Sequence, residues 1–462
     1  MTDQPAPDEG EPGDGRLLSA TMVGVASGAI LVPLNSTMLA VALPSVMTAF
    51  SVPPDAAAAL VTVYLGAVTI AVPISGSLGD RFGHRRAFLI GVTGFGLASL
   101  VAAFAPAFAV LVIARVLQAV SGALVSTSSV ALIRATAPAS RRGAAFGLFD
   151  MLVSTSAALG PIVGGLIVGA FDWRAMFLLA APIALIAVLA VALRPDPMLL
   201  AEARGERLTR RSVDVPGLAV LALLLLAVLL ALRAGRDGPI DWLAAAAIPI
   251  ILVAFLRLEL RTEHPAVDPR LFASRPFAAA VAGVLLSTIV LHATLVLVPL
   301  LIEVLQHGSP ETSGLVLLGI SALGAVAAPF GGRLSDRVGR RSPALVGAVA
   351  VAIGLAVLWQ VSTVASAIVL GLLLAIVGAG MGLAGSPRQA AALETVAPDR
   401  VGMAAGTYYT GRYLGGVLGA SLAGAVLGGA VTGAGVSLGF GLLTLVAIAL
   451  VAASRGLPGR RA

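Results

Sequence analysis

The sequence reads GSLGDRFGHRR from Gly76 to Arg86 and GRLSDRVGRR from Gly332 to Arg341. Both copies follow one pattern: Gly, any residue, Leu, any residue, Asp, Arg, any residue, Gly, a basic residue and Arg. Each copy is a short polar interval between two long apolar stretches, which predicts a tight turn between two membrane-spanning helices. Because the turn occurs twice, the chain is expected to consist of two similar halves.

The composition around the repeat indicates an all-α integral membrane protein. Of the 462 residues, 58% are hydrophobic and only 11% are charged, unlike an ordinary soluble domain. A helix needs roughly 20 apolar residues to cross a bilayer. Division at charged residues and at Pro or Gly breaks predicts fourteen transmembrane helices, at 17–43, 57–78, 87–107, 108–133, 144–170, 175–193, 217–233, 241–257, 277–303, 312–331, 343–361, 365–386, 402–427 and 433–454.

The distribution of arginine predicts how the chain is oriented in the cell membrane. With both termini in the cytoplasm, the outer loops receive only Arg174, Arg233 and Arg236, while the inner segments receive most of the others. This is the asymmetry that the positive-inside rule describes. The rule does not separate twelve spans from fourteen, because removing the pair at 217–233 and 241–257 leaves every other orientation unchanged.

The same divisions predict five segments along the chain. The first is rich in Pro, Gly and acidic residues and is expected to be a disordered cytoplasmic tail. Two six-helix bundles follow, separated by an inner linker that carries two additional transmembrane helices. The segments are the tail at 1–16, the first bundle at 17–193, the linker with its helix pair at 194–275, the second bundle at 276–454 and a cytoplasmic tail at 455–462.

The repeated turns resemble the loop signature of the major facilitator superfamily, and other segments match the family at the expected places. ARVLQAVSG, from Ala114 to Gly122, is similar to its intramembrane Arg-x-x-Gln-Gly element. GPIVGG, from Gly160 to Gly165, and RYLGGVLG, from Arg412 to Gly419, extend the likeness. With fourteen spans, the chain resembles the fourteen-spanner branch of drug/proton antiporters. The resemblance covers nearly the whole chain and implies two bundles of three-plus-three inverted repeats around a central cavity.

The resemblance implies alternating access, with export of small amphipathic molecules against proton entry. The expected partners are a small-molecule substrate, protons and the lipid bilayer, with no nucleic acid, and a monomer is expected. No cofactor is expected, because the chain contains no Lys for a phosphate-binding Gly-rich loop and no Cys for a thiolate metal site. No nucleophile, base and orienting residue recur at a plausible spacing, so an enzyme is not expected. Two alternatives remain: a carrier or facilitator of a small organic anion or zwitterion, and a non-transporting membrane scaffold or receptor.

The first span departs from the pattern of this branch. The run LNSTMLAVALP, from Leu34 to Pro44, carries Asn35 where the branch usually has an Asp. The ninth span carries Glu303 where a Gln is common. Asparagine cannot ionise, so the proton carrier must be sought elsewhere.

Polar residues inside the spans are the candidates for the substrate or proton pathway, because lipid exposure would penalise them most. Arg115 and Asn35 lie at similar distances from the outer ends of their spans, so they are expected at one depth. Asp150 is the only acid clearly inside a span and is the predicted proton carrier; alternatively, it stays solvated and pairs with Arg141 or Arg142. The full pathway set is Asn35, Arg115, Gln118, Asp150, His292 and Arg412.

Two further groups of residues are expected to control the movement of the bundles. The repeated turns predict paired cytoplasmic latches in which each Asp acts with the Arg that follows it, and in which Gly allows close helix approach and a positive φ. The latch residues are Gly76, Asp80, Arg81, Gly83, Gly332, Asp336, Arg337 and Gly339. Small residues predict close packing of the fifth span, at Gly160, Pro161, Gly164 and Gly165.

Overall fold

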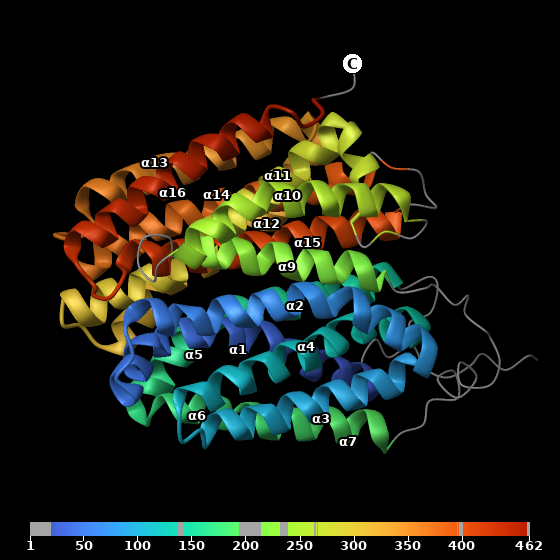
Figure 1. The fold of residues 1–462 in the computed structure, drawn as a ribbon, viewed down its shortest axis with the longest axis horizontal. Helices are drawn as coiled ribbons and strands as arrows, with labels where there is room; N and C mark the ends of the chain where they lie inside the picture. The colour runs from blue at the N-terminus through green and yellow to red at the C-terminus, as the bar shows by residue number, and fades with distance from the viewer. Residues whose placement is uncertain are drawn as a thin grey trace, which may run out of the picture.

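The computed structural model describes residues 20–136, 142–193, 214–231, 239–262, 265, 267–394, 396 and 401–459. Every regular element in these residues is helical. Most of the helices are long and run side by side along the long axis of the molecule (Figure 1). The expected all-α architecture is therefore the observed one.

The first half contains six predicted spans, and its helices form one packed group. Its elements are α1 (Ala20–Phe50), α2 (Pro54–Phe82), α3 (His84–Ala103), α4 (Phe108–Thr136), α5 (Arg142–Ala170), α6 (Trp173–Leu178) and α7 (Ala180–Ala192). Helix α1 packs against α5 and α7, and α4 packs against α2 and α3. The predicted sixth span is interrupted at Leu179, so that Pro182 falls in the first turn of α7, where a proline is tolerated.

The second half repeats this packing with another set of helices. It begins with the short 3-10 helix η2 (Pro269–Ala273) and continues with α11 (Arg275–Pro299), the π-helical turn η3 (Leu300–Leu305), α12 (Pro310–Val338), α13 (Arg341–Val361), α14 (Ala367–Glu394), α15 (Val401–Leu427) and α16 (Gly433–Ser454). Helix α11 packs against α15 and α16, and α14 packs against α12 and α13. These pairs correspond to those of the first half, as the internal repeat predicts.

Two helices lie between the halves in the chain, α9 (Val215–Ala231) and α10 (Pro239–Arg261). They pack against each other, and α9 also touches α2 (Figure 1). The predicted tail at 1–16 and residues 194–213 of the inner linker lie outside the described residues, whereas residues 455–459 of the predicted tail at 455–462 lie within them.

Eleven helices in the described residues are long and apolar enough to cross a membrane. The predicted spans at 144–170 and 217–233 contain shorter apolar helices, Thr155–Ala170 and Val215–Val228. The predicted span at 402–427 coincides with α15, whose Arg412, tyrosines and many glycines make it less apolar. The count of fourteen spans therefore stays a prediction.

Candidate functional site

A buried polar cluster joins three helices of the first half. Arg115 on α4 donates from Nη1 to Asn35 Oδ1 on α1 at 2.7 Å and to Gln118 Oε1 at 3.0 Å. Gln118 in turn donates from Nε2 to Ser99 Oγ on α3 at 2.7 Å. Arg115 and Gln118 have no exposed surface, and Asn35 is 3% exposed. The equal depth predicted for Asn35 and Arg115 agrees with this contact.

Neutral groups surround the charge of Arg115. Its guanidinium carbon lies 4.1 Å from the centroid of the Tyr64 ring on α2, a cation–π geometry. Within the described part of the chain, Arg115 Nε and Nη2 and Asn35 Nδ2 find no hydrogen-bond partner. The cluster therefore holds a positive charge whose hydrogen-bonding capacity is only partly used.

Among the described side chains, no hydrogen bond joins the remaining predicted pathway residues to this cluster. His292 on α11 makes a hydrogen bond between Nδ1 and its own helix, at Thr288 O (3.0 Å). It also borders Gly416 on α15, where an added Cβ would lie 3.1 Å from the His292 ring. Arg412, one turn before Gly416, is exposed and acts electrostatically on His292. The side chain of Asp150 lies outside those that the structure describes.

The GPIVGG segment of α5 makes close contacts within its own bundle and with the other bundle; within its own, an added Cβ on Gly160 would collide with Thr37 of α1. An added Cβ on Gly164 would lie 3.0 Å from Met38 O of α1, inside the same bundle. An added Cβ on Gly165 would lie 2.6 Å from Pro310 O of α12, in the other bundle, and one on Gly314 would lie 2.5 Å from Pro161 O. The small residues thus let two backbones meet across the boundary between the bundles.

A second seam between the bundles runs along α2 and α15. Thr62 Oγ1 and Ser421 Oγ lie 3.2 Å apart in a hydrogen bond, and an added Cβ on Gly424 would lie 3.2 Å from Ala58 Cβ. Both seams lie toward the end that the arginine distribution assigns to the outside. Toward the other end, an added Cβ on Gly76 or Gly406 would meet nothing within 4 Å. These contacts between the bundles therefore lie toward their outer ends, whereas Gly76 of α2 and Gly406 of α15, toward the inner ends, face open space.

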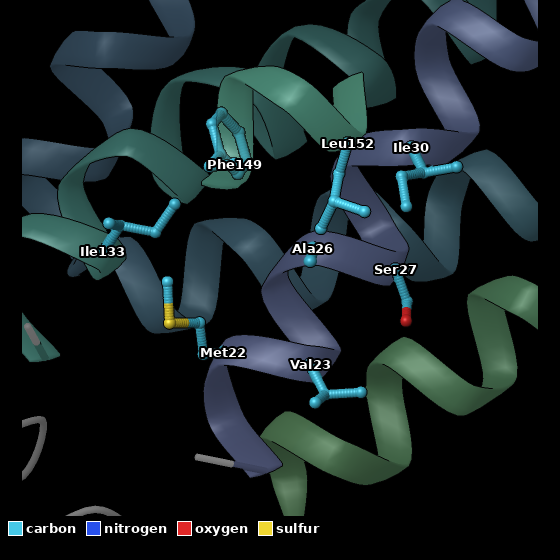
Figure 2. A pocket seen from close by; sticks show the side chains of 8 residues that line it. All are labelled: Met22, Val23, Ala26, Ser27, Ile30, Ile133, Phe149 and Leu152. Carbon is cyan, nitrogen blue, oxygen red and sulfur yellow. The ribbon is translucent and has the colours of Figure 1, made fainter. Parts of the chain in front are cut away.

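An apolar pocket lies near the inner ends of α1, α4 and α5 (Figure 2). Its volume is about 170 Å³. Apart from Ser27 it is lined by apolar side chains: Met22, Val23, Ala26 and Ile30 of α1, Ile133 of α4, and Phe149 and Leu152 of α5. Sequence analysis misses this pocket, because such residues at helical spacing look the same whether they face lipid, a neighbouring helix or a hollow.

The second repeated turn forms an ion-pair network, although with a different arginine from the predicted one. Arg340, not Arg337, pairs with Asp336, at 2.7 Å from Nη1 to Oδ1, and also binds Ser335 Oγ at 2.8 Å. Its other edge forms a two-point contact with Glu394 at the end of α14. The hydrogen bond to Glu394, followed by that to Asp336, raises the pKa of Arg340 above its ordinary value. A carboxylate needs a donor directed at it, and Arg337, the next residue in the sequence, projects to the exposed surface instead.

The first repeated turn has the same backbone shape. Gly83 has φ of +89° and Gly339 has φ of +88°, the left-handed region that glycine adopts without strain. Each N–H closes its preceding helix, on Gly79 O and Ser335 O respectively. The predicted close approach at Gly76 is absent, and at Gly332 an added Cβ would make only ordinary contact, 3.7 Å from Ser386.

The predicted pair of Asp80 and Arg81 lies outside the described side chains. Instead, Arg85 of the same motif donates from Nη2 to Val191 O and Ala192 O, both at 3.1 Å. These are carbonyls of the last turn of α7, where a cation is favourable. The first turn is therefore fastened to the inner end of its own bundle.

Removing Arg340 should loosen the inner end of the second bundle. Asp336 and Glu394 are largely exposed, so Arg340→Ala is expected to cost about 1 kcal/mol, a roughly fivefold shift in any equilibrium that breaks the network. Thermal unfolding in detergent and the reactivity of a cysteine placed at Ser386 would measure the loss. Arg337→Ala is the matched control, and an equal effect of that variant would contradict the assignment.

Known proteins resemble this chain over most of its length. The family model described as Major Facilitator Superfamily matches residues 25–420 and 280–461. The Tetracenomycin C resistance and export protein of Streptomyces glaucescens is 32% identical over 416 residues, covering 87% of this chain and 74% of that protein. The Puromycin resistance protein pur8 of Streptomyces alboniger is 30% identical, covering 87% of this chain and 80% of its own. An uncharacterized MFS-type transporter of Bacillus subtilis, YvkA, is 32% identical, with 87% and 89% covered.

Solved structures resemble the chain in fold. A peptide transporter POT in complex with alafosfalin has a TM-score of 0.71 at 18% identity, covering 97% of this chain and 98% of that one. A D-xylose-proton symporter has a TM-score of 0.65 at 17% identity, covering 95% and 98%. At such low identity these similarities concern the arrangement of helices alone.

Proposed function

Because the chain belongs to the major facilitator superfamily, we propose that this transporter exports small amphipathic compounds from the cytoplasm in exchange for protons. The two bundles would rock about a shared central site, so that it opens alternately to either side. The relatives named for resistance and export support the direction and the class of substrate.

The asymmetry of the boundary between the bundles is the observation that carries this proposal. Alternating access requires contacts that close one end while the other end stays apart. The outer contacts include backbone meeting backbone at Gly165 and Gly314, and a hydrogen bond between Thr62 and Ser421. Contacts of this kind form and break without reordering large side chains, which suits a seam that opens in every cycle.

The apolar pocket of the first bundle supports an amphipathic substrate. Its volume of about 170 Å³ is below the ~300–1,000 Å³ of typical drug-sized sites, so it suits the apolar part of a compound. It lies between α1 and α5 at their inner halves, on the side from which an exported molecule would enter. We propose that it receives the apolar end of the substrate.

The topology proposed for this function follows from the arginine distribution. Both termini would lie in the cytoplasm, and α9 and α10 would be two additional spans between bundles at 17–193 and 276–454. This arrangement gives fourteen spans, as in the drug/proton antiporter branch that the motifs resemble. We propose that one chain carries the whole pathway and works as a monomer.

A second candidate function is the transport of a small organic anion or zwitterion. Arg115 favours it, because the partners of this buried cation are Asn35 and Gln118, neither of which neutralises it. A substrate carboxylate would supply the missing negative charge. As a carrier or facilitator, this candidate differs from the first in the charge of the transported compound and does not require proton exchange.

We propose Asp150 as the acid that exchanges protons during transport, since Asn35 stands where the branch usually carries an acid. Asp150→Asn is expected to abolish substrate accumulation driven by a pH gradient, while exchange of substrate down its own gradient continues. The reason is that an amide preserves the shape of the side chain but cannot bind and release a proton. Uptake into proteoliposomes under both conditions would measure the two activities, and full pH-driven accumulation by the variant would contradict this role.

The function itself is tested with the same proteoliposomes, an imposed pH gradient and a panel of cationic, neutral and anionic compounds. Accumulation of cationic or neutral amphipathic compounds would support drug export. Accumulation of anions alone would favour the second candidate. If no compound moved, either with the pH gradient or down its own gradient, the transport proposal would fail for this panel.

A further inference from the structure

Glu303 lies in the turn that brings the second bundle against the first at the outer end. The π-helical turn η3 follows Pro299, which has no N–H to continue the α-helical bonding of α11. Its Leu300, Leu301 and Ile302 share one apolar core with Leu43 of α1, across the boundary between the bundles. π-helical turns are uncommon and frequently mark functional positions.

One oxygen of the Glu303 carboxyl group is buried without a hydrogen bond to any described residue. Oε1 is inaccessible and has no hydrogen-bond partner in the described part of the chain. Ser313 of α12 is fully buried, and its hydroxyl lies close enough to this carboxyl to act as a hydrogen-bond donor to it, although outside normal hydrogen-bond geometry. A hydroxyl can donate to a carboxylate or accept from a protonated carboxyl, so Ser313 can accompany Glu303 in either form. The ionised form additionally needs a counter-charge, which the neutral form does not.

None of the helices described as packing on η3 places a positively charged side chain near Glu303. Among the helices that pack on it, α1 and α16 contain no charged residue. Helix α11 contributes only His292, several turns away, and Arg275 at its opposite end. Helix α12 contributes Glu311 near Glu303 and keeps its other charges at its inner end. In the loop that follows, His307 is exposed.

The nearest charge also belongs to the closed seam. Glu311 lies against Gly169 of α5, beside the contact between Gly165 and Pro310, and it acts on Glu303 as a like charge. When the seam closes, the Glu311 carboxylate therefore comes to lie against the first bundle, near that of Glu303. Closing costs more when Glu303 is ionised, because its charge loses water and gains no cation as a partner.

We infer that Glu303 is a proton-binding site of the outer gate, defined as the contacts between the bundles at their outer ends: η3 with α1, the start of α12 with α5, and α2 with α15. One proton from the outer medium binds the Glu303 carboxylate and yields the neutral acid, with no other bond made or broken. The neutral acid stabilises the closed gate, and the ionised form stabilises the open gate, where outer water reaches it. Low external pH therefore favours closure, and rising pH favours opening.

The effect of pH on the ratio of closed to open gate has an upper limit. A ligand shifts a two-state equilibrium only by its differential affinity for the two states. One proton that binds the closed state more tightly changes the ratio of closed to open gate by at most about tenfold per pH unit. The inference uses the alternating access of the proposed function and requires neither a particular substrate nor proton exchange.

The test measures access to the outer gate as a function of external pH. The chain has no cysteine, so Ser421→Cys provides a single reporter within the seam between α2 and α15. A membrane-impermeant maleimide added outside reports opening. Phe171→Cys, at an outer position that is 81% exposed, corrects for the pH dependence of thiol reactivity. Labelling of Ser421→Cys relative to Phe171→Cys should rise with pH, by up to about tenfold per unit between pH 5.5 and 8.

Glu303→Gln should abolish this pH dependence and keep the seam closed, because the amide is always neutral and has nearly the same shape. His307→Asn is the matched control, since this histidine is an ionisable residue of the same loop, and asparagine tolerates its φ of +53°. That variant should retain the wild-type slope. A flat wild-type profile, or a Glu303→Gln variant with the wild-type slope, would overturn the inference.

The measurement contains no substrate, so its outcome is independent of the transport assay. Failed transport with a pH-dependent gate would count against the proposed function alone. Normal pH-driven transport with a gate indifferent to Glu303 would count against this inference alone. A slope lost in His307→Asn and kept in Glu303→Gln would assign the switch to the histidine and would likewise overturn it.

Discussion

Replacing Arg115 by methionine is expected to reduce transport roughly 100-fold or more. The variant loses two hydrogen bonds from a charged donor, each of which contributes ~1.5–3 kcal/mol, and every 1.4 kcal/mol is tenfold. Asn35 Oδ1 and Gln118 Oε1, now bonded to Nη1 at 2.7 and 3.0 Å, would be left in a buried site without this donor. Methionine fills much of the volume of the arginine side chain, so the variant should still fold. Its transport activity should therefore fall by more than its yield of folded protein. Substrate exchange in proteoliposomes, normalised to the reconstituted amount, measures it.

Two companion variants separate charge from geometry at this position. Arg115→Lys keeps the charge but loses the planar fork, and it should recover only a small part of the activity. Asn35→Asp would place a carboxylate where the amide oxygen now lies, 2.7 Å from Arg115 Nη1. That variant should bind an anionic substrate less well, because the guanidinium gains an internal counter-charge. Wild-type activity in Arg115→Met would show that the cluster has no part in transport.

Replacing Gly165 by leucine is expected to prevent closure of the outer gate and to reduce transport about 100-fold. Even a Cβ at this position would lie 2.6 Å from Pro310 O, a backbone atom that cannot move aside without moving the start of α12. Overpacking of this kind typically costs ~1–3 kcal/mol, and here the cost falls only on the closed state. Labelling of Ser421→Cys from outside should increase accordingly.

The control for this variant lies one residue further along α5. Leu166 is 57% exposed, so Leu166→Phe adds bulk away from the seam and should leave both labelling and transport close to wild type. If Gly165→Leu transported normally, the contact between α5 and α12 would not belong to the cycle. Loss of folded protein in Gly165→Leu but not in Leu166→Phe would instead show that the contact is needed for assembly.

Local chemistry made some features of the fold predictable from sequence. The repeated turns required a residue that accepts positive φ, and Gly83 and Gly339 meet this requirement. Matching positions within their spans brought Asn35 and Arg115 to one depth. Small residues in GPIVGG indicated close packing. Only the structure shows that Gly164 packs against α1 of its own bundle and Gly165 against α12 of the other bundle.

Features that depend on distant residues were not predictable. The partner of Arg340 is Glu394, far along the chain, so local reading chose the adjacent Arg337 for Asp336. The surroundings of Glu303 depend on four helices that pack around η3, so the sequence near Glu303 does not show that its Oε1 is buried without a hydrogen-bond partner among the described residues. The pocket between α1, α4 and α5 depends on how three apolar surfaces fail to fill the space between them. None of these leaves a periodic signal in the sequence.

The second repeated turn is also attached to the end of the chain. Arg341 N donates to Pro458 O at 3.0 Å, and Leu457 is only 3% exposed. The last described residues are thus held beside the network of Arg340. For laboratory work, the carboxyl terminus is therefore a poor place for an affinity tag or a fluorescent reporter. A fused domain there would pull on the turn whose movement one wishes to observe, and a longer spacer would reduce that disturbance.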